Sequence, residues 1–293
     1  MIEPATPISS APCRWVWWAY VAGLTVLFGG DLVAWARFGL GSSLHSYVLL
    51  IPFVSLYLLH EQKTSRAPIY TTPRARAVLA VGAALFFLLA FAGAARTDFD
   101  GSLDRSRLFM AIALFAVGLF IRWGAQGLRL RAFPVLFLFL MLPLTPALEQ
   151  AFSALLQWAS GWTAYALIRA TGTPILKDGP FLSLPGLELE VAEACSGIRS
   201  TLVLLVTSIV VGQQFLRGRG ARLLFTAVVI PIGILRNSLR ILVIAWLTVH
   251  VDPDIIRGPL HVHGGPLFFA LSLVLLFGVL ASLRWRERPE LRA

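Results

Sequence analysis

Charged residues are scarce in this chain, making up 14% of its 293 residues, whereas 57% are hydrophobic and the mean hydropathy is +0.77. A soluble domain carries about 25% charged residues, so the composition excludes an ordinary cytosolic enzyme and a disordered chain. Internal repeats, low-complexity segments and the alternating strands of an outer-membrane barrel are also missing. The sequence therefore predicts an all-α polytopic membrane protein.

Cysteine is nearly absent, since Cys13 and Cys195 are the two examples. The chain has no CxxC pair and no HExxH motif, and its neighbouring histidines, His261 and His263, have no carboxylate at ligand spacing. We therefore predict no metal and no other cofactor. Cys13 is expected on the cytoplasmic side and Cys195 on the external side, which excludes a disulfide between them.

Apolar runs of about 20 residues, the length that crosses a bilayer, recur along the chain. The first run lacks a convincing cleavage site, so we expect it to remain as a helix. All the runs are expected to form one integral membrane domain over residues 1–293. About eight transmembrane helices are predicted, at residues 15–35, 43–60, 77–95, 108–123, 132–148, 197–216, 222–247 and 260–283.

The net charge of +10 comes from 25 Lys and Arg against 15 Asp and Glu, and the charges lie between the apolar runs. Cytoplasmic loops carry the excess of Lys and Arg, so this charge indicates topology and not nucleic-acid binding. Acidic residues gather in the other loops, which we expect on the external side. Five segments are predicted to be cytoplasmic: 1–14, 61–76, 122–131, 217–222 and 284–293.

The stretch between the basic loops 122–131 and 217–222 must cross the membrane an even number of times. Because 197–216 is one crossing, the preceding residues supply one more, although they hold two apolar runs. We therefore expect 151–170, the less hydrophobic run, to form a helix on or dipping into the outer surface. If 151–170 spans instead, the following loop moves to the cytoplasm.

The external loop 171–194 is the one long polar connection in the chain. Its residues 181–184 and 187–191 alternate between apolar and polar side chains around Pro185-Gly186. Alternation on both sides of a turn is typical of a β-hairpin. We therefore predict a small β-hairpin immediately before the helix that carries Cys195.

Cys195 lies in the segment Glu193-Ala-Cys-Ser-Gly-Ile-Arg-Ser200, at the predicted outer end of a helix. Amide groups and the positive dipole end at a helix N-terminus lower the pKa of a thiol and favour the thiolate. A lone cysteine is more often a small buried apolar residue. Its small and polar neighbours favour a nucleophile here.

Two arginines, Arg236 and Arg240, lie within an apolar run, where charged side chains are costly and indicate function. At 1.5 Å per residue from Arg222 at the inner surface, Arg240 lies roughly 27 Å along the helix, near the outer face. His261 and His263 enter the last predicted span from the same face. A thiolate needs a base or a cation, and Arg can stabilise an oxyanion. These three types of residue form a coherent acyl-transfer site.

The chain resembles the exosortase/archaeosortase family of membrane transpeptidases over most of its length. The resemblance includes the segment that starts at His45, the Leu142–Pro146 segment, the specific Glu193–Ser200 block, Asn237-Ser-Leu-Arg240-Ile and a looser His-x-x-x-Gly pattern at His261–Gly265. It implies that Cys195 is the nucleophile, that Arg240 stabilises the thiolate or oxyanion, and that His261 is the acid/base. His263 is the alternative, because the spacing does not decide between the two.

The resemblance implies a cysteine peptidase or transpeptidase in the inner membrane, with its active site on the external, periplasmic side. Its partners would be exported proteins whose C-terminal sorting signal has a short motif (commonly Pro-Glu-Pro, as in PEP-CTERM proteins), a transmembrane helix and a basic cluster. A thioacyl-enzyme would then pass to an amine acceptor on a lipid or surface polymer, or to water. Such systems often accompany exopolysaccharide genes.

Two other classes of protein remain open at this point. In a transporter or channel, Arg236, Asn237 and Arg240 would line an anion path, and Cys195 would be incidental. In a non-enzymatic assembly factor for polysaccharide export, Cys195 would be an ordinary thiol. The sequence does not define the sorting motif, the acceptor or the oligomeric state.

Overall fold

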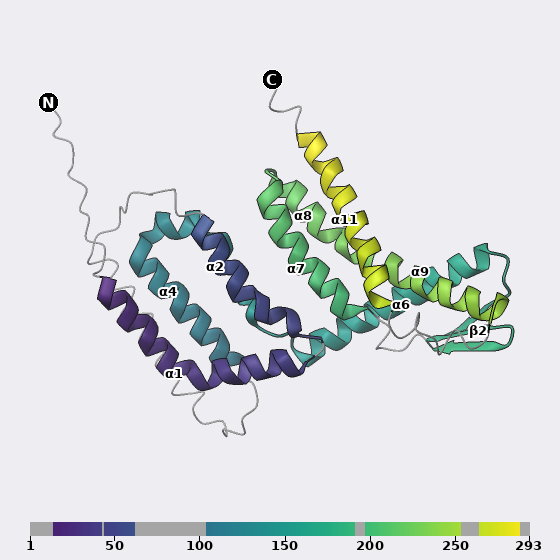
Figure 1. Ribbon diagram of the computed structural model, residues 1–293, viewed down its shortest axis with the longest axis horizontal. Coiled ribbons are helices and arrows are strands. Elements are labelled where there is room, and N and C mark those ends of the chain that lie inside the picture. The colour runs from purple at the N-terminus through teal and green to yellow at the C-terminus, as the bar shows by residue number, and fades with distance from the viewer. Residues whose placement is uncertain (1–13, 43, 62–103, 191–196, 253–263, 288–293) are drawn as a thin grey trace. The chain divides into compact units, whose positions relative to one another are not determined.

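The computed structural model describes residues 14–42, 44–61, 104–190, 197–252 and 264–287, and these are mostly helical. The chain divides into two compact units, Met1–Pro143 and Leu144–Ala293. Figure 1 shows the helices of each unit and the small sheet of the second. The protein is a polytopic helical membrane protein, because five described helices are long and apolar enough to cross a bilayer.

The first unit contains six helical elements among its described residues. They are α1 (Arg14–Gly41), η1 (Ser46–Leu50), α2 (Ile51–Glu61), α4 (Arg105–Leu130), α5 (Ala132–Phe137) and η3 (Leu138–Met141). α1 packs along α4, and α2 packs against α5 and η3. Asp104 starts α4 by accepting hydrogen bonds from the amides of Ser106 (2.8 Å) and Arg107 (3.2 Å), two donors that a helix N-terminus leaves unpaired.

The second unit holds the segments that the sequence associates with chemistry. Its elements are α6 (Pro146–Ala170), β1 (Leu176–Asp178), β2 (Phe181–Leu184), β3 (Leu187–Glu190), α7 (Ile198–Phe215), α8 (Arg219–Ala227), α9 (Val229–His250) and α11 (Gly265–Glu287). α8 ends at Ala227 and α9 follows, since Pro231 has no amide hydrogen to donate to the carbonyl four residues earlier.

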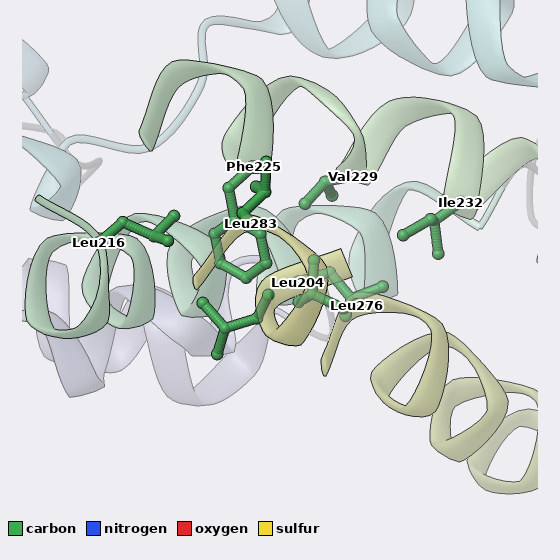
Figure 2. Close-up of a cluster of buried hydrophobic side chains, with 8 residues drawn as sticks. Leu204, Leu216, Phe225, Val229, Ile232, Leu276 and Leu283 are labelled. Carbon is green, nitrogen blue, oxygen red and sulfur yellow. The ribbon is translucent and has the colours of Figure 1, made fainter. Parts of the chain in front are cut away.

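One apolar cluster joins α7, α8, α9 and α11. Figure 2 shows its side chains pointing toward one another from these helices. Because lipid tails are as apolar as leucine, membrane helices associate through close packing more than through the hydrophobic effect. The clustered residues are Leu204, Leu216, Phe225, Val229, Ile232, Leu276, Leu280 and Leu283.

The α6 and α9 helices pack along each other in the same direction. The Ser238 hydroxyl of α9 donates a hydrogen bond to the Ser160 carbonyl of α6 (3.0 Å). Further along both helices, Ala164 and Ile168 share a buried cluster with Ala245. Short side chains at such contacts let membrane helices approach closely. The segment 151–170, which we predict to lie on or dip into the outer surface, forms most of the 25-residue helix α6. The second half of α6 packs against α9.

A three-stranded antiparallel sheet follows α6, in the order β1-β2-β3. Leu182 pairs with Leu189, and Leu184 pairs with Leu187 across β2 and β3. Leu182 and Leu184 are buried in the cluster with Ala164 and Ala245, so one face of the sheet rests on α6 and α9. The sheet contains one more strand than the alternation predicts.

The predicted spans correspond only in part to helices of the described residues. Five correspond to helices of spanning length: Trp17–Gly41, Arg105–Gly124, Ile198–Phe215, Arg219–His250 and Gly265–Glu287. The predicted span 43–60 falls on Ser46–Glu61, an apolar helical stretch below spanning length, and 77–95 lies outside the described residues. A sixth crossing is added if Ala132–Met141 and Pro146–Ala170 form one broken span. The number eight therefore stays a prediction.

A broken span at 132–170 predicts that the sheet lies outside the membrane. In a Cys13→Ser, Cys195→Ser background, the exposed positions Glu188 and Arg219 are changed singly to cysteine. We expect a membrane-impermeant maleimide to label Glu188→Cys in right-side-out vesicles and Arg219→Cys only after permeabilisation. Labelling of Glu188→Cys only after permeabilisation, with Arg219→Cys labelled directly, would mean two crossings in 132–170, because Ile198–Phe215 separates the two positions.

An ion pair holds α1 to α4 inside the first unit. The Arg107 Nε atom lies 2.9 Å from the Asp31 Oδ1 atom, and the side chains are 15% and 8% exposed, respectively. Removing one partner of a buried pair costs about 3–5 kcal/mol, because the other charge stays buried alone, whereas replacing both is often neutral. We therefore expect Asp31→Leu to unfold at markedly lower denaturant than Asp31→Leu with Arg107→Met. Equal stability of the two variants would contradict a buried pair. The measurement is unfolding of the full chain in mixed detergent micelles.

Candidate functional site

The structure describes part of the predicted site. Cys195, His261 and His263 lie outside the described residues, whereas Gly197, Arg236 and Arg240 lie within them. Gly197 and Gly264 are the described residues that directly follow the cysteine segment and the histidine segment. Among the described residues, no group of His, Cys, Asp or Glu could hold a metal ion.

Gly197 forms the turn that starts α7, two residues after Cys195. Its φ of +70° and ψ of 16° are left-handed, a conformation that glycine adopts without steric cost. Its carbonyl accepts hydrogen bonds from the Thr201 amide (3.0 Å), the Thr201 hydroxyl (2.9 Å) and the Ser200 hydroxyl (3.1 Å). The first turn of α7 is thus fixed at one carbonyl.

Arg236 of α9 reaches the same carbonyl. Its Nη2 atom donates a hydrogen bond to the Gly197 carbonyl (3.0 Å), and the side chain is 4% exposed. A Cβ atom added at Gly197 would collide with Arg236 Nη2. Glycine at this position therefore suits the turn and also leaves room for the guanidinium.

A second close contact between α7 and α9 lies one turn deeper. A Cβ atom added at Gly233 of α9 would lie 2.7 Å from the Thr201 hydroxyl oxygen of α7. Real Cβ atoms essentially never come that close to another heavy atom, so a side chain at Gly233 would push the helices apart. The absence of a side chain at Gly233 lets Arg236 reach across to Gly197.

Arg236 and its neighbour Asn237 retain buried donors for an oxygen atom. Arg236 Nη1 and Asn237 Nδ2 are both buried without a hydrogen-bond partner in the described part of the chain. No described carboxylate lies within ion-pair distance of Arg236. Buried donors and charges are normally paired. Among the described residues, the start of α7 therefore lies against a buried positive charge and two donors without an acceptor.

Arg240 extends this positive region along α9. It follows Arg236 by four residues and is half-buried. Residues four apart lie on one face of a helix, so the two Cα positions are about 6 Å apart along its axis. The apolar cluster lies on the other side of Gly197 along the bundle. Arg240 thus lies at the end of the bundle where α7 begins.

The start of α11 lies at the level of the start of α7. Glu287 at the end of α11 accepts hydrogen bonds from the amides of Gly218 (2.9 Å) and Arg217 (3.1 Å), just after α7. α7 and α11 therefore run in the same direction, as Figure 1 also shows. Counting back at 1.5 Å per residue, Ile198 is about 30 Å and Gly265 about 33 Å from this contact. The segments that carry Cys195 and the two histidines therefore join the same end of the bundle.

A family model described as transmembrane exosortase matches residues 35–278. The chain belongs to the transmembrane exosortase family. The resemblance seen in the sequence is thereby confirmed, and with it a membrane protein of the sorting transpeptidase class. Comparison with curated proteins and with solved structures gives no match.

Some features of the site are visible only in the structure. The sequence identifies Arg236 as lying one turn from Arg240, but not that its guanidinium holds Gly197. It also does not identify the approach of Gly233 to Thr201. The available signal was a single glycine in each segment, Gly197 and Gly233, and single glycines are common in membrane helices.

The turn at Gly197 can be tested against a matched glycine. Gly186 has a similar φ of +75°, but nothing lies within 4 Å of an added Cβ atom. Gly186→Ala is expected to cost only the backbone strain, about 1–2 kcal/mol. Gly197→Ala adds displacement of Arg236 and should lower the unfolding midpoint in detergent by a clearly larger amount. Equal decreases of the unfolding midpoint for both variants would show that displacing the Arg236 side chain costs no stability.

Proposed function

We propose that this exosortase is a cysteine transpeptidase that cleaves the C-terminal sorting signal of exported proteins on the external side of the inner membrane. The observation that carries the proposal is the convergence at one end of the second unit. The helix after Cys195, the buried Arg236 and half-buried Arg240 of α9, and the helix after the histidines all meet there. A thiolate, a cation and a base are the groups that acyl transfer requires.

Cys195 is the proposed nucleophile. Its thiolate attacks the scissile carbonyl carbon, and the negative charge moves to the carbonyl oxygen. Arg240 stabilises the thiolate or this oxyanion by charge-assisted hydrogen bonds. The helix dipole at the start of α7 contributes in the same sense, because its N-terminal end is positive.

His261 is the proposed acid/base, with His263 as the alternative. It takes the thiol proton and delivers it to the leaving amine when the C–N bond breaks. The exported protein is then bound to Cys195 as a thioester, and the membrane helix of the signal departs. An amine of a lipid or surface polymer, or water, attacks the thioester and restores the thiol. Transfer to an amine is the proposed outcome.

Processing of a reporter tests this assignment. The reporter is an exported protein with a Pro-Glu-Pro-type C-terminal signal, co-expressed with each variant and analysed by size and mass. Cys195→Ser is expected to abolish processing. Arg240→Ala should reduce the rate about 10²–10³-fold, and His261→Ala about 10²–10⁴-fold. Product mass separates an amine acceptor from water.

Two controls sharpen this experiment. Arg219→Ala removes an exposed arginine at the start of α8, near the other end of α7, and should process like wild type. His263→Ala should also process like wild type if His261 is the base, and the reverse result exchanges the two histidines. Normal processing by Cys195→Ser would refute the nucleophile. Membrane transport that survives Cys195→Ser, without any processing, would favour the transporter.

A further inference from the structure

Arg236 is a buried cation, and its hydrogen bond to the Gly197 carbonyl does not require a charged donor. The Gly197 carbonyl has two lone pairs and already accepts three hydrogen bonds from Ser200 and Thr201. A fourth donor, Arg236 Nη2 at 3.0 Å, is therefore not required to satisfy this oxygen. A neutral side chain at position 236 would avoid the cost of burying a guanidinium.

The cost of this burial is increased by its surroundings. Arg236 is 4% exposed, no described carboxylate pairs with it, and Arg240 adds a second positive charge one turn away. Taking an ion out of water costs several kcal/mol unless an opposite charge compensates it. The remaining donors, Arg236 Nη1 and Asn237 Nδ2, have no acceptor in the described residues. Such an arrangement suits a site that must hold negative charge.

The position of the guanidinium links this charge to the nucleophile. It is bonded to the carbonyl of Gly197, and Cys195 precedes Gly197 by two residues. Two residues span at most about 7 Å, so the backbone of Cys195 is tied within that distance of the Gly197 turn. A cation near a cysteine favours the thiolate over the thiol.

We propose that Arg236 is a positioning residue of the thiol reaction: through the Gly197 carbonyl it holds the turn that starts α7, two residues after Cys195, and it supplies a second positive charge that favours the thiolate. This inference rests on the proposed function, in which Cys195 is the nucleophile. It differs from the role of Arg240, since Arg236 acts through the backbone of α7. The proton released by the thiol goes to the base, and no other bond changes in this step.

The test is the pH dependence of Cys195 alkylation by iodoacetamide in the purified full chain. A Cys13→Ser background leaves Cys195 as the one thiol of the chain. Arg236→Met is expected to move the midpoint of the rate profile to higher pH, because the thiolate loses a cation. A shift of one pH unit lowers the alkylation rate near neutral pH about tenfold. Arg236→Lys keeps the charge, so its alkylation midpoint should stay close to that of the wild type. Its processing of the reporter should still fall, because the fixed geometry of the guanidinium is lost.

Arg222 provides a matched control at the other end of α7. Its Nε atom donates a hydrogen bond to the Leu216 carbonyl (2.8 Å), and its Nη1 atom donates one to the Gln213 side chain (2.7 Å). Arg222→Met removes an arginine-to-carbonyl contact of the same kind, so it should lower stability and leave the alkylation midpoint unchanged. If Arg236→Met also leaves the midpoint unchanged, Arg236 supports only the structure and the proposal fails.

Alkylation and processing separate this proposal from the function on which it rests. The alkylation profile needs no substrate, so a shifted midpoint supports Arg236 even if the reporter carries the wrong motif. Processing by Cys195→Ser would instead overturn the proposed function itself. Arg236→Gln, which keeps a donor without the charge, replaces Arg236→Met if the latter does not fold, and the same shift to higher pH is expected. An unshifted Arg236→Gln profile would likewise overturn the proposal.

Discussion

The hydrogen bond from Arg236 to the Gly197 carbonyl joins α9 to the first turn of α7, and the geometry of the site depends on it. This bond forms because two positions lack a side chain. Gly197 leaves room for the guanidinium, and Gly233 lets the α9 backbone approach Thr201. Close approach of this kind is the usual route to tight helix packing in a membrane. The same two glycines therefore set both the packing of the helices and the position of a charge.

Arg107 and Arg236 show two ways in which this protein keeps a cation in an apolar environment. Arg107 lies 2.9 Å from the Asp31 carboxylate, so its charge is compensated and its contact holds α1 to α4. Arg236 contacts a carbonyl dipole, and no described carboxylate compensates its charge. A buried arginine that serves only the stability of the fold is expected to pair with a carboxylate, because a buried charge without its partner is destabilising. The proposed role of Arg236 toward the Cys195 thiolate would need a positive charge that no carboxylate of the described residues compensates.

Much of the fold could be predicted from apolar runs and charge. The helices α7, α9 and α11 occupy the runs at 197–216, 222–247 and 260–283, because length and hydropathy define a span. The break between η3 and α6 was harder to interpret. Prolines at 143 and 146 mark it, but whether the next helix lies on the surface or packs against α9 depends on partners such as Ser238, and periodicity does not identify partners.

The candidate site was predictable in its residue types and not in its contacts. Arg236, Arg240 and Gly197 are visible in the sequence as charges in an apolar run and as a small residue after Cys195. Their arrangement depends on the register between α7 and α9, which is a tertiary property. The family match confirms the class of protein, whereas the roles of Cys195 and the histidines stay predictions.

Both ends of α7 are held by charged side chains from other helices, and this fixes where the active segments leave the bundle. At one end Glu287 of α11 binds the amides of Arg217 and Gly218, where the N-terminus of α8 favours a carboxylate. At the other end Arg236 of α9 binds the carbonyl of Gly197. Glu287 attaches the end of α11 to the residues that follow α7. The two helices therefore cannot slide along each other without breaking these charge-assisted hydrogen bonds. The first residues of α7 and α11, next to the cysteine and histidine segments, are therefore held at a constant offset along the bundle. The proposed reaction, which needs a thiol and an imidazole at one carbonyl group, would require such an offset.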